Sequence, residues 1–486
     1  MKKEKLKTCI LILLICSATA LAASVWFGNG VWPRGYDFFA TLPERTFFSK
    51  IFRKEQPYVS PMENLAKPQK LVVTNGECRS VYYNSDASYA LYYDAISNFF
   101  TTVLSDESLV FLKNEVPESE WYGVLRNDEL LDSKSVYISY STAFSPRLFA
   151  EVTGAKYTWL ESGTAALREL ILTPIEAQGQ DVLLYVRDAK TGTITKYHIN
   201  YPHKNELYSC ISSLAETDNY SFAFELNLHD SQVGIGGGVS QKVVMDPLLL
   251  ISPRASRSSA IVGENPIAGS SDMEALLSVF GYRERGVNHH TGADGKEHFV
   301  ENYGSISVSP DGLVEFYALD AEKGVGILPD EQGVATLYDS LNGAAEFAAS
   351  VWKSLVPDQP FEALISSDLV ENAAGDYTFT MDYYFEGTPI AISTSQMQHG
   401  LEMRVKNGRI ITYRHLLRRF SGWGEPLENM SMLQAIDGLY AQLQDEGEQI
   451  RILDLFLSYI EDTQPGEKRP VWCARIAGRP EPLFCN

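Results

Sequence analysis

The chain has 486 residues, of which 45% are hydrophobic and 12% aromatic, and its formal net charge at pH 7 is −21. This length is enough for two or three domains, each with its own core. The acidic balance argues against nucleic-acid binding, which needs clustered Lys and Arg side chains. Six cysteines in a chain of this length do not form a disulfide scaffold.

The first thirty residues predict a membrane anchor. Four lysines precede the uncharged run 8–27, and about 20 apolar residues span a hydrocarbon core of roughly 30 Å. Lysines on one flank, with Trp26 and Trp32 at the other, orient such a helix with its N-terminus in the cytoplasm. We therefore expect a cytoplasmic tail at 1–7, a transmembrane helix at 8–27, and a single-pass protein of the cell membrane whose bulk is extracellular.

A cleaved signal peptide is the alternative interpretation of this run. The charged start, the apolar segment and the small residues Ala20, Ala22 and Ala23 all fit one. The run continues through Trp26 and Phe27 instead of ending in a polar stretch, which favours a retained anchor. Under both interpretations, the rest of the chain is exported from the cytoplasm.

Residues 28–70 are rich in prolines and aromatics and are expected to form a juxtamembrane linker. A first globular domain follows at 71–255. Within it the segment 88–105 repeats apolar residues every fourth position, which predicts a helix. The expected elements are helices at 88–105 and 207–214 and strands at 71–73, 80–83, 135–141, 181–187, 193–201 and 220–228.

The turn-rich stretch 252–271 predicts a domain boundary near 252–270. The second mass, 270–486, repeats a helix followed by antiparallel strands, so the fold class is α+β with helices packed on antiparallel sheets. The expected helices are 272–280, 340–356 and 430–443, and the expected strands are 297–302, 305–309, 313–318, 376–385, 388–393, 401–406, 409–413, 450–461, 470–476 and 482–484.

Motifs for catalysis are scarce. The sequence has no G-x-S-x-G nucleophile elbow and no H-E-x-x-H zinc motif. His289, His290, Asp294 and His298 could form a metal cluster, but their segment is Gly-rich and turn-like, which favours a solvated loop. We therefore expect no enzyme activity, no cofactor and no metal.

The strand 382–387 carries the aromatic run Tyr383, Tyr384 and Phe385. Such a run usually packs a sheet face against a helix. A peptide or glycan groove is the alternative. Trp423, in the stretch 418–426, is expected in a loop between units.

Arg414, Arg418 and Arg419 form a basic cluster in an acidic chain. The cluster could meet an acidic partner, although a solvated or internally paired strand end is the expected arrangement.

Four cysteines lie beyond the apolar run. Cys473 and Cys485 could bridge a terminal hairpin, which leaves Cys78 and Cys210 as a candidate pair. The sequence alone does not decide whether either bridge forms.

Several segments, in this order, resemble the YycH family, and the C-terminal half is similar to its companion YycI. They are SVYISYSTAFSPRLF (135–149), VLLYVRDAKTGTITKYHI (182–199), MDPLLLISP (245–253), FVENYGSISVSPDGLVEFYA (299–318), YYFEGTPI (383–390), VKNGRIITY (405–413) and RPVWCARI (469–476). The resemblance implies a single-pass membrane protein of Gram-positive bacteria that modulates a cell-wall two-component sensor histidine kinase. Its implied partners are that kinase and a YycI-like anchored protein, and the implied extracytoplasmic domains are not enzymes.

Contact between transmembrane helices would suit such a role. Small residues let helix backbones approach closely in lipid, and the candidate contact residues are Ser17, Ala18, Thr19, Ala22 and Ala23. These small residues could equally belong to a signal-peptide-like end. The competing function is an exported binding protein or cell-wall-acting enzyme that recognises a peptide or peptidoglycan fragment.

Overall fold

The structure is a computed structural model of the chain. The chain divides into two units, 1–59 and 60–486, and the residues described all belong to the second. The predicted tail, the predicted anchor and the linker up to residue 61 lie outside the described residues. The description covers 62–485 except 63–64, 77, 85, 87, 127–133, 156–157, 176–180, 215–218, 229–242, 268–272, 283–286, 329–334, 367–368, 395, 444–449, 465 and 480–481.

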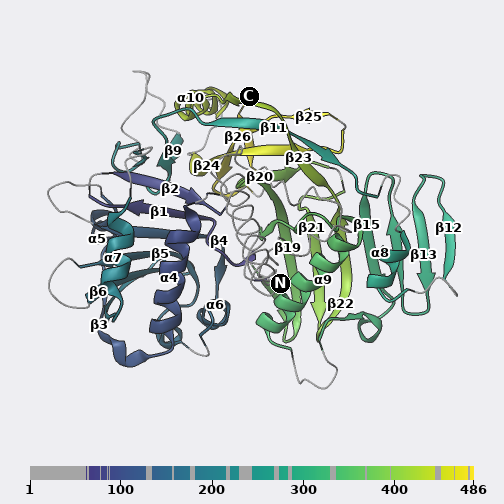
Figure 1. Cartoon of the computed structure of the whole chain (residues 1–486), viewed down its shortest axis with the longest axis horizontal. Helices are drawn as coiled ribbons and strands as arrows, with labels where there is room; N and C mark the ends of the chain where they lie inside the picture. Colours follow the sequence, from purple (N-terminus) through teal and green to yellow (C-terminus); the bar gives the residue numbers. More distant parts are fainter. Residues whose placement is uncertain are drawn as a thin grey trace, which may run out of the picture. The chain divides into compact units, whose positions relative to one another are not determined.

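A seven-stranded antiparallel sheet occupies the first part of this unit (Figure 1). Its order is β2 (Arg79–Tyr83), β1 (Lys70–Thr74), β4 (Ser135–Phe144), β5 (Leu167–Pro174), β6 (Asp181–Asp188), β7 (Ile194–Asn200) and β3 (Val110–Val116). The helices of this part are α4 (Tyr89–Leu104), α5 (Glu118–Leu125), α6 (Pro146–Val152) and α7 (Lys204–Ser212), with short 3-10 turns at Glu107–Leu109 and Trp159–Ser162.

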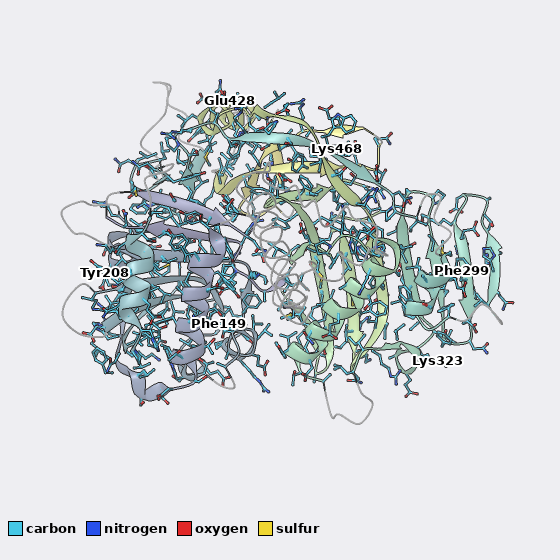
Figure 2. The ribbon with its side chains drawn as sticks, viewed as in Figure 1. Phe149, Tyr208, Phe299, Lys323, Glu428 and Lys468 are labelled. Carbon is cyan, nitrogen blue, oxygen red and sulfur yellow. The ribbon has the colours of Figure 1, made fainter. Side chains whose placement is uncertain are left out.

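Both faces of this sheet are covered. Helix α4 buries Ile96, Phe99 and Val103 on one face, where α4 and α7 lie side by side. Phe149 of α6, labelled in Figure 2, meets Phe100 of α4 edge-on at 5.1 Å between ring centroids. The opposite face has a separate apolar cluster, built from Trp121 of α5 and the short segments 222–224 and 248–250. Coverage of both faces explains why strand β4 is buried along nearly its whole length.

A fifteen-stranded sheet follows. Its main path is β12 (Asn288–Thr291), β13 (Glu297–Glu301), β14 (Gly304–Val308), β15 (Leu313–Ala318), β22 (Arg409–Leu416), β21 (Leu401–Lys406), β19 (Asp376–Phe385), β20 (Thr388–Ile392), β24 (Ile450–Glu461), β26 (Val471–Ile476) and β27 (Leu483–Cys485). Four short strands pair beside this path: β16 (Val325–Gly326), β17 (Ala363–Ile365), β18 (Val370–Ala373) and β9 (Val243–Met245). The pairings of β24 with β20 and β9 are parallel, and the remaining pairings in this sheet are antiparallel.

Helices and small sheets complete this part. Helices α8 (Met273–Val279) and α9 (Leu337–Leu355) contact each other, and α9 contacts β19 and β21. The apolar face of α9 includes Leu341, Ala344, Ala348 and Val351, all buried. The remaining elements are α10 (Met432–Leu443), a 3-10 turn at Ala321–Lys323, the two-stranded sheet β8 (Ser221–Phe222) and β10 (Leu250–Ile251), and the three-stranded sheet β23 (Arg419–Glu428), β11 (Arg257–Glu264) and β25 (Glu467–Lys468).

The expected α+β class is confirmed. None of the described helices is long and apolar enough to cross a membrane. The stretch expected to separate two domains contains β11, whose main partner is β23, about 160 residues later in the chain. Strand β9 also precedes that stretch yet pairs with β24. Long-range pairing therefore ties the expected boundary region into the second part of the fold.

Three local expectations are corrected by the structure. Most of the stretch 418–426 belongs to strand β23, in which Arg419 to Trp423 pair with β11. The histidine segment forms strand β12 in a hairpin with β13 instead of a loop. In the expected strand 220–228 only Ser221–Phe222 pair, and turns follow. The reason is that Glu225 folds back and both of its carboxylate oxygens accept hydrogen bonds from buried Arg79.

Candidate interaction site

The candidate helix-contact residues lie outside the described residues: Ser17, Ala18, Thr19, Ala22 and Ala23. Their role stays a prediction. The other sequence-based candidates fall on described elements.

Cys473 and Cys485 lie on adjacent strands, β26 and β27, but not opposite each other. Cys473 pairs with Phe484, and Cys485 pairs with Trp472. Alternate side chains of a strand point to opposite faces, so this register sends the two thiols to opposite sides of the hairpin. Both thiols are free in this structure. The register is therefore a physical reason to expect no bridge, which a mass measurement can test.

Burial dominates the chemistry of these thiols. It raises the pKa of Cys485 to about 12. Burial, with a smaller contribution from Cys485, also raises the pKa of Cys473 to about 12. A thiol with so high a pKa is almost wholly protonated at neutral pH and is a poor nucleophile. Cys78 and Cys210 also carry no disulfide; their sulfur atoms donate to Asn75 Oδ1 and to the carbonyl of Leu91.

The three arginines of the basic cluster are paired inside the chain. Arg414 donates to Glu402 at 2.7 Å and to Glu315 at 3.2 Å. Arg419 pairs with Glu264 across the β11–β23 ribbon. Arg418 is buried, and its Nε donates to Glu461 Oε1 at 3.1 Å. The cluster is therefore not a free surface for an acidic partner.

The histidine segment pairs with itself and with its neighbouring strand. His289 stacks on Phe299, labelled in Figure 2, with ring centroids 4.6 Å apart, and it contacts Glu297. His290 stacks on His298 at 4.9 Å. Across the described stretches of 62–485, no three His, Cys, Asp or Glu side chains are grouped so that they could hold a metal ion.

The β11–β23 ribbon exposes apolar side chains. Trp423 on β23 is 59% exposed, and it is followed by Leu427, Met430 and Leu433, which are also exposed. These four exposed residues are close in the sequence, on β23, after it and on α10, and we call them the Trp423 patch. Figure 2 labels Glu428, the last residue of β23, and Lys468 on β25.

The outer edge of β23 has no strand partner within the described part of the chain. A register shift opposite Ser258–Ala260 bulges the strand around 424–426, where Gly424 has φ +73 and Pro426 lacks a backbone N–H. Bulges and prolines blunt an edge against strand addition. The patch therefore suits a partner that packs on its side chains, for which exposed Trp is a typical anchor.

A line of cavities lies where β1 approaches the fifteen-stranded sheet. Lys70 Nζ lies 3.6 Å from Asp454 Oδ1, and Gln69 Nε2 donates to the Tyr384 hydroxyl at 3.5 Å. Gln69 lines three cavities of about 330, 320 and 170 Å³. A fourth cavity, of about 420 Å³, is lined by the aromatic run of β19. The run thus packs a sheet and also walls a cavity.

A buried network holds the inner end of this aromatic run. The Tyr383 hydroxyl lies 2.5 Å from His415 Nε2 and donates to the carbonyl of Leu416 at 3.1 Å. Tyr413 OH lies 2.6 Å from His415 Nδ1. Burial lowers the pKa of His415 to about 3, so the imidazole is neutral at physiological pH. A neutral ring can donate to Tyr383 and accept from Tyr413, so the network has a structural role.

No family model matches the sequence, and no curated protein matches it significantly. The structure is similar to the crystal structure of YycH from Bacillus subtilis, with a TM-score of 0.56 and 11% sequence identity. The similarity covers 87% of this chain and 97% of that chain. The chain has the YycH fold. At this identity the likeness concerns the fold.

The order of the sequence segments predicted the YycH fold, and two of those segments form the hairpins expected of them. The segment 182–199 forms the β6–β7 hairpin, and 405–413 forms the tight turn between β21 and β22. At that turn Asn407 and Gly408 have φ of 49° and 71°, which is the reason for the Asn-Gly pair.

Sequence reasoning missed the exposure of the Trp423 patch and the position of Glu362 beside the aromatic run. Trp423 itself was noticed, but the exposure of its strand depends on pairing with a distant segment.

Proposed function

We propose that this chain is a membrane-anchored regulatory protein that modulates a cell-wall two-component sensor histidine kinase. The observation that carries the proposal is the YycH fold, which extends over 87% of the chain. The uncharged run 8–27 supports the anchor, and a YycI-like anchored protein is the proposed companion. No ligand chemistry is needed for this role, because the regulator acts by binding.

Regulation requires a difference in affinity. A protein that binds two kinase states equally does not change the equilibrium between them. To change the ratio of the two states from 1:99 to 99:1, it must bind one state about 5.5 kcal/mol more favourably than the other. Two contacts are available to supply it. One is helix packing in the membrane through the small residues at 17–23. The other is the Trp423 patch, where burial of a large aromatic side chain contributes roughly 1.5–3 kcal/mol.

Co-purification from membranes with a candidate kinase tests this proposal. Four chains are compared: the intact chain, a chain with 8–27 replaced by an unrelated transmembrane helix, Trp423→Glu, and Leu319→Glu. Leu319 is a matched control because it is 68% exposed and lies outside the patch. We expect the helix replacement and Trp423→Glu each to reduce kinase capture, and Leu319→Glu to leave it unchanged. Capture that is equal for all four chains would contradict both contacts.

A second candidate function is an exported binding protein for a peptide or peptidoglycan fragment. The specific observation in its favour is the aromatic-lined cavity of about 420 Å³, which falls within the roughly 300–1,000 Å³ typical of ligand pockets. A calorimetric screen of wall fragments against the intact chain tests this candidate. Binding at micromolar concentration would rank it above kinase regulation.

A further inference from the structure

The aromatic-lined cavity joins four segments of the second part of the fold. They are the end of α9, the connection from α9 to β17, the end of β19 with its turn to β20, and the link from β22 to β23. We call it the aromatic–carboxylate cavity. It is lined by Trp352, Gln359, Pro360, Glu362, Tyr383, Tyr384, Phe385, Glu386, Arg418 and Phe420.

The aromatic walls are fixed before any ligand arrives. Trp352 and Tyr383 are buried, with ring centroids 6.0 Å apart, and Phe420 meets Tyr383 edge-on at 5.5 Å. The Trp352 indole N–H donates to the carbonyl of Gln359 at 3.0 Å. Tyr383 is further held by His415 from beneath. A preorganised wall of this kind lowers the entropy lost on binding.

Strand pairing brings two carboxylates to this wall. Strands β17 and β19 are antiparallel with Ala363 opposite Tyr383, so Glu362 comes beside the end of β19. Glu386 follows β19 directly, at the first position of the two-residue turn to β20. Neither carboxylate has a hydrogen-bond or ion-pair partner among the residues that the structure describes. Both carboxylates are exposed, and partial desolvation by the cavity wall, followed by the charge of Glu386, raises the pKa of Glu362.

The cation in the lining does not balance these carboxylates. Arg418 is already neutralised by Glu461, which is buried and lies 3.1 Å away. The charge left facing the cavity therefore comes from Glu362 and Glu386. An anionic ligand would be repelled, whereas a cation would meet two carboxylates and several aromatic rings. Aromatic faces attract ammonium and guanidinium groups through their quadrupoles.

We propose that the aromatic–carboxylate cavity binds an organic cation on an alkyl stem, such as the lysine or arginine side chain of a peptide. The stem packs against the aromatic rings, and the charged head lies between Glu362 and Glu386. This proposal deepens the second candidate function by naming its ligand class, and it does not depend on a kinase partner.

The first experiment is isothermal titration calorimetry on the full chain in detergent micelles, with acetyl-Gly-X-Gly-amide peptides. X is lysine, arginine, norleucine or glutamate; norleucine keeps the alkyl stem without the charge. We expect lysine and arginine to bind at least about tenfold more tightly than norleucine, as one lost charge-assisted contact implies. Glutamate should not bind. Butylammonium, which has the stem and charge of lysine without a peptide backbone, is titrated in the same way. If the natural ligand is a peptide, the lysine peptide should bind more tightly than butylammonium.

The second experiment uses the isosteric variants Glu362→Gln, Glu386→Gln and the double variant. We expect about a tenfold loss of lysine-peptide affinity for each single variant and a larger loss for the double variant. Glu371→Gln is the control, because Glu371 is an exposed carboxylate outside the cavity lining. An unchanged melting temperature establishes that each variant is folded.

Three results would overturn this proposal: equal affinity for the lysine and norleucine peptides, no binding by any peptide, or unchanged lysine-peptide affinity in the double variant. Kinase capture by the double variant is measured separately. Loss of peptide binding with normal kinase capture by the double variant would support the proposed ligand. Normal peptide binding with loss of kinase capture would refute the proposed ligand and leave the kinase proposal standing.

Discussion

The buried ion pair between Arg418 and Glu461 offers a sharp test of how the second part of the fold is held together. The two side chains are 4% and 1% exposed. Arg418 also donates to the carbonyl of Leu417 at 2.8 Å, and Glu461 Oε1 accepts from the backbone N–H of Thr463 at 2.9 Å. Arg418→Met removes the cation but keeps most of the apolar stem, so the variant leaves a buried carboxylate without its main partner.

Breaking a buried pair from one side costs about 3–5 kcal/mol. Lys468 Nζ lies 3.7 Å from Glu461 Oε2 and partly compensates, which places the expected cost near the lower end. For a unit spanning 60–486, an unfolding entropy of roughly 2.1 cal/mol/K per residue converts this cost to a fall in Tm of about 3–4 °C. Arg418→Met with Glu461→Gln removes both charges, so the double variant should melt above the single variant.

Thermal unfolding of the full chain in detergent, followed by near-UV circular dichroism, measures these differences. The parent, both single variants and the double variant complete a thermodynamic cycle. A single Arg418→Met variant that melts within about 1 °C of the parent would refute the cost assigned to the orphaned carboxylate. Strictly additive effects of the two substitutions would likewise show that the two groups are not coupled.

Three further predictions address other parts of the fold. Two hydrogen bonds from Arg404 hold the pKa of Asp376 below its ordinary value, so this pair stabilises the fold above the ordinary carboxyl pKa and stops doing so as the pH falls through the lowered pKa. Arg404→Gln should therefore make Tm fall less steeply with decreasing pH in the acid range. Parallel curves of Tm against pH for the parent and the variant would contradict this. Cys473 and Cys485 should remain free, so the intact mass should not change on reduction, and a gain of about 2 Da would identify a bridge. Gly304→Ala should destabilise the chain by about 1–3 kcal/mol, because its added Cβ would lie 2.8 Å from the carbonyl oxygen of Tyr317; an unchanged Tm would contradict the close approach.

The periodic parts of the fold could be predicted from the sequence because their signals are local. The segment 88–105 repeats apolar residues at helical spacing, and the observed helix is Tyr89–Leu104. The long alternating strand 450–461 was likewise expected, and it is β24. Buried residues on one side of an element are enough to fix its type, whatever its partner is.

The parts that were missed depend on distant partners. Strand β23 contains Gly422, Gly424 and Pro426, which locally favour a loop, and only its pairing with β11 makes it a strand. The two carboxylates of the cavity are separated by more than twenty residues and meet only through the register of β17 on β19. Because no spacing in the sequence encodes that register, the cavity could not be predicted from the sequence alone.

The most direct test of the regulatory proposal is the autophosphorylation rate of a candidate sensor kinase in proteoliposomes. The rate is measured with no added protein, with the intact chain, and with a chain whose segment 8–27 is replaced by an unrelated transmembrane helix. The proposal predicts that the intact chain changes the rate and that the replaced chain changes it less. A rate that is the same in all three preparations, over a range of protein-to-kinase ratios, would contradict the proposal.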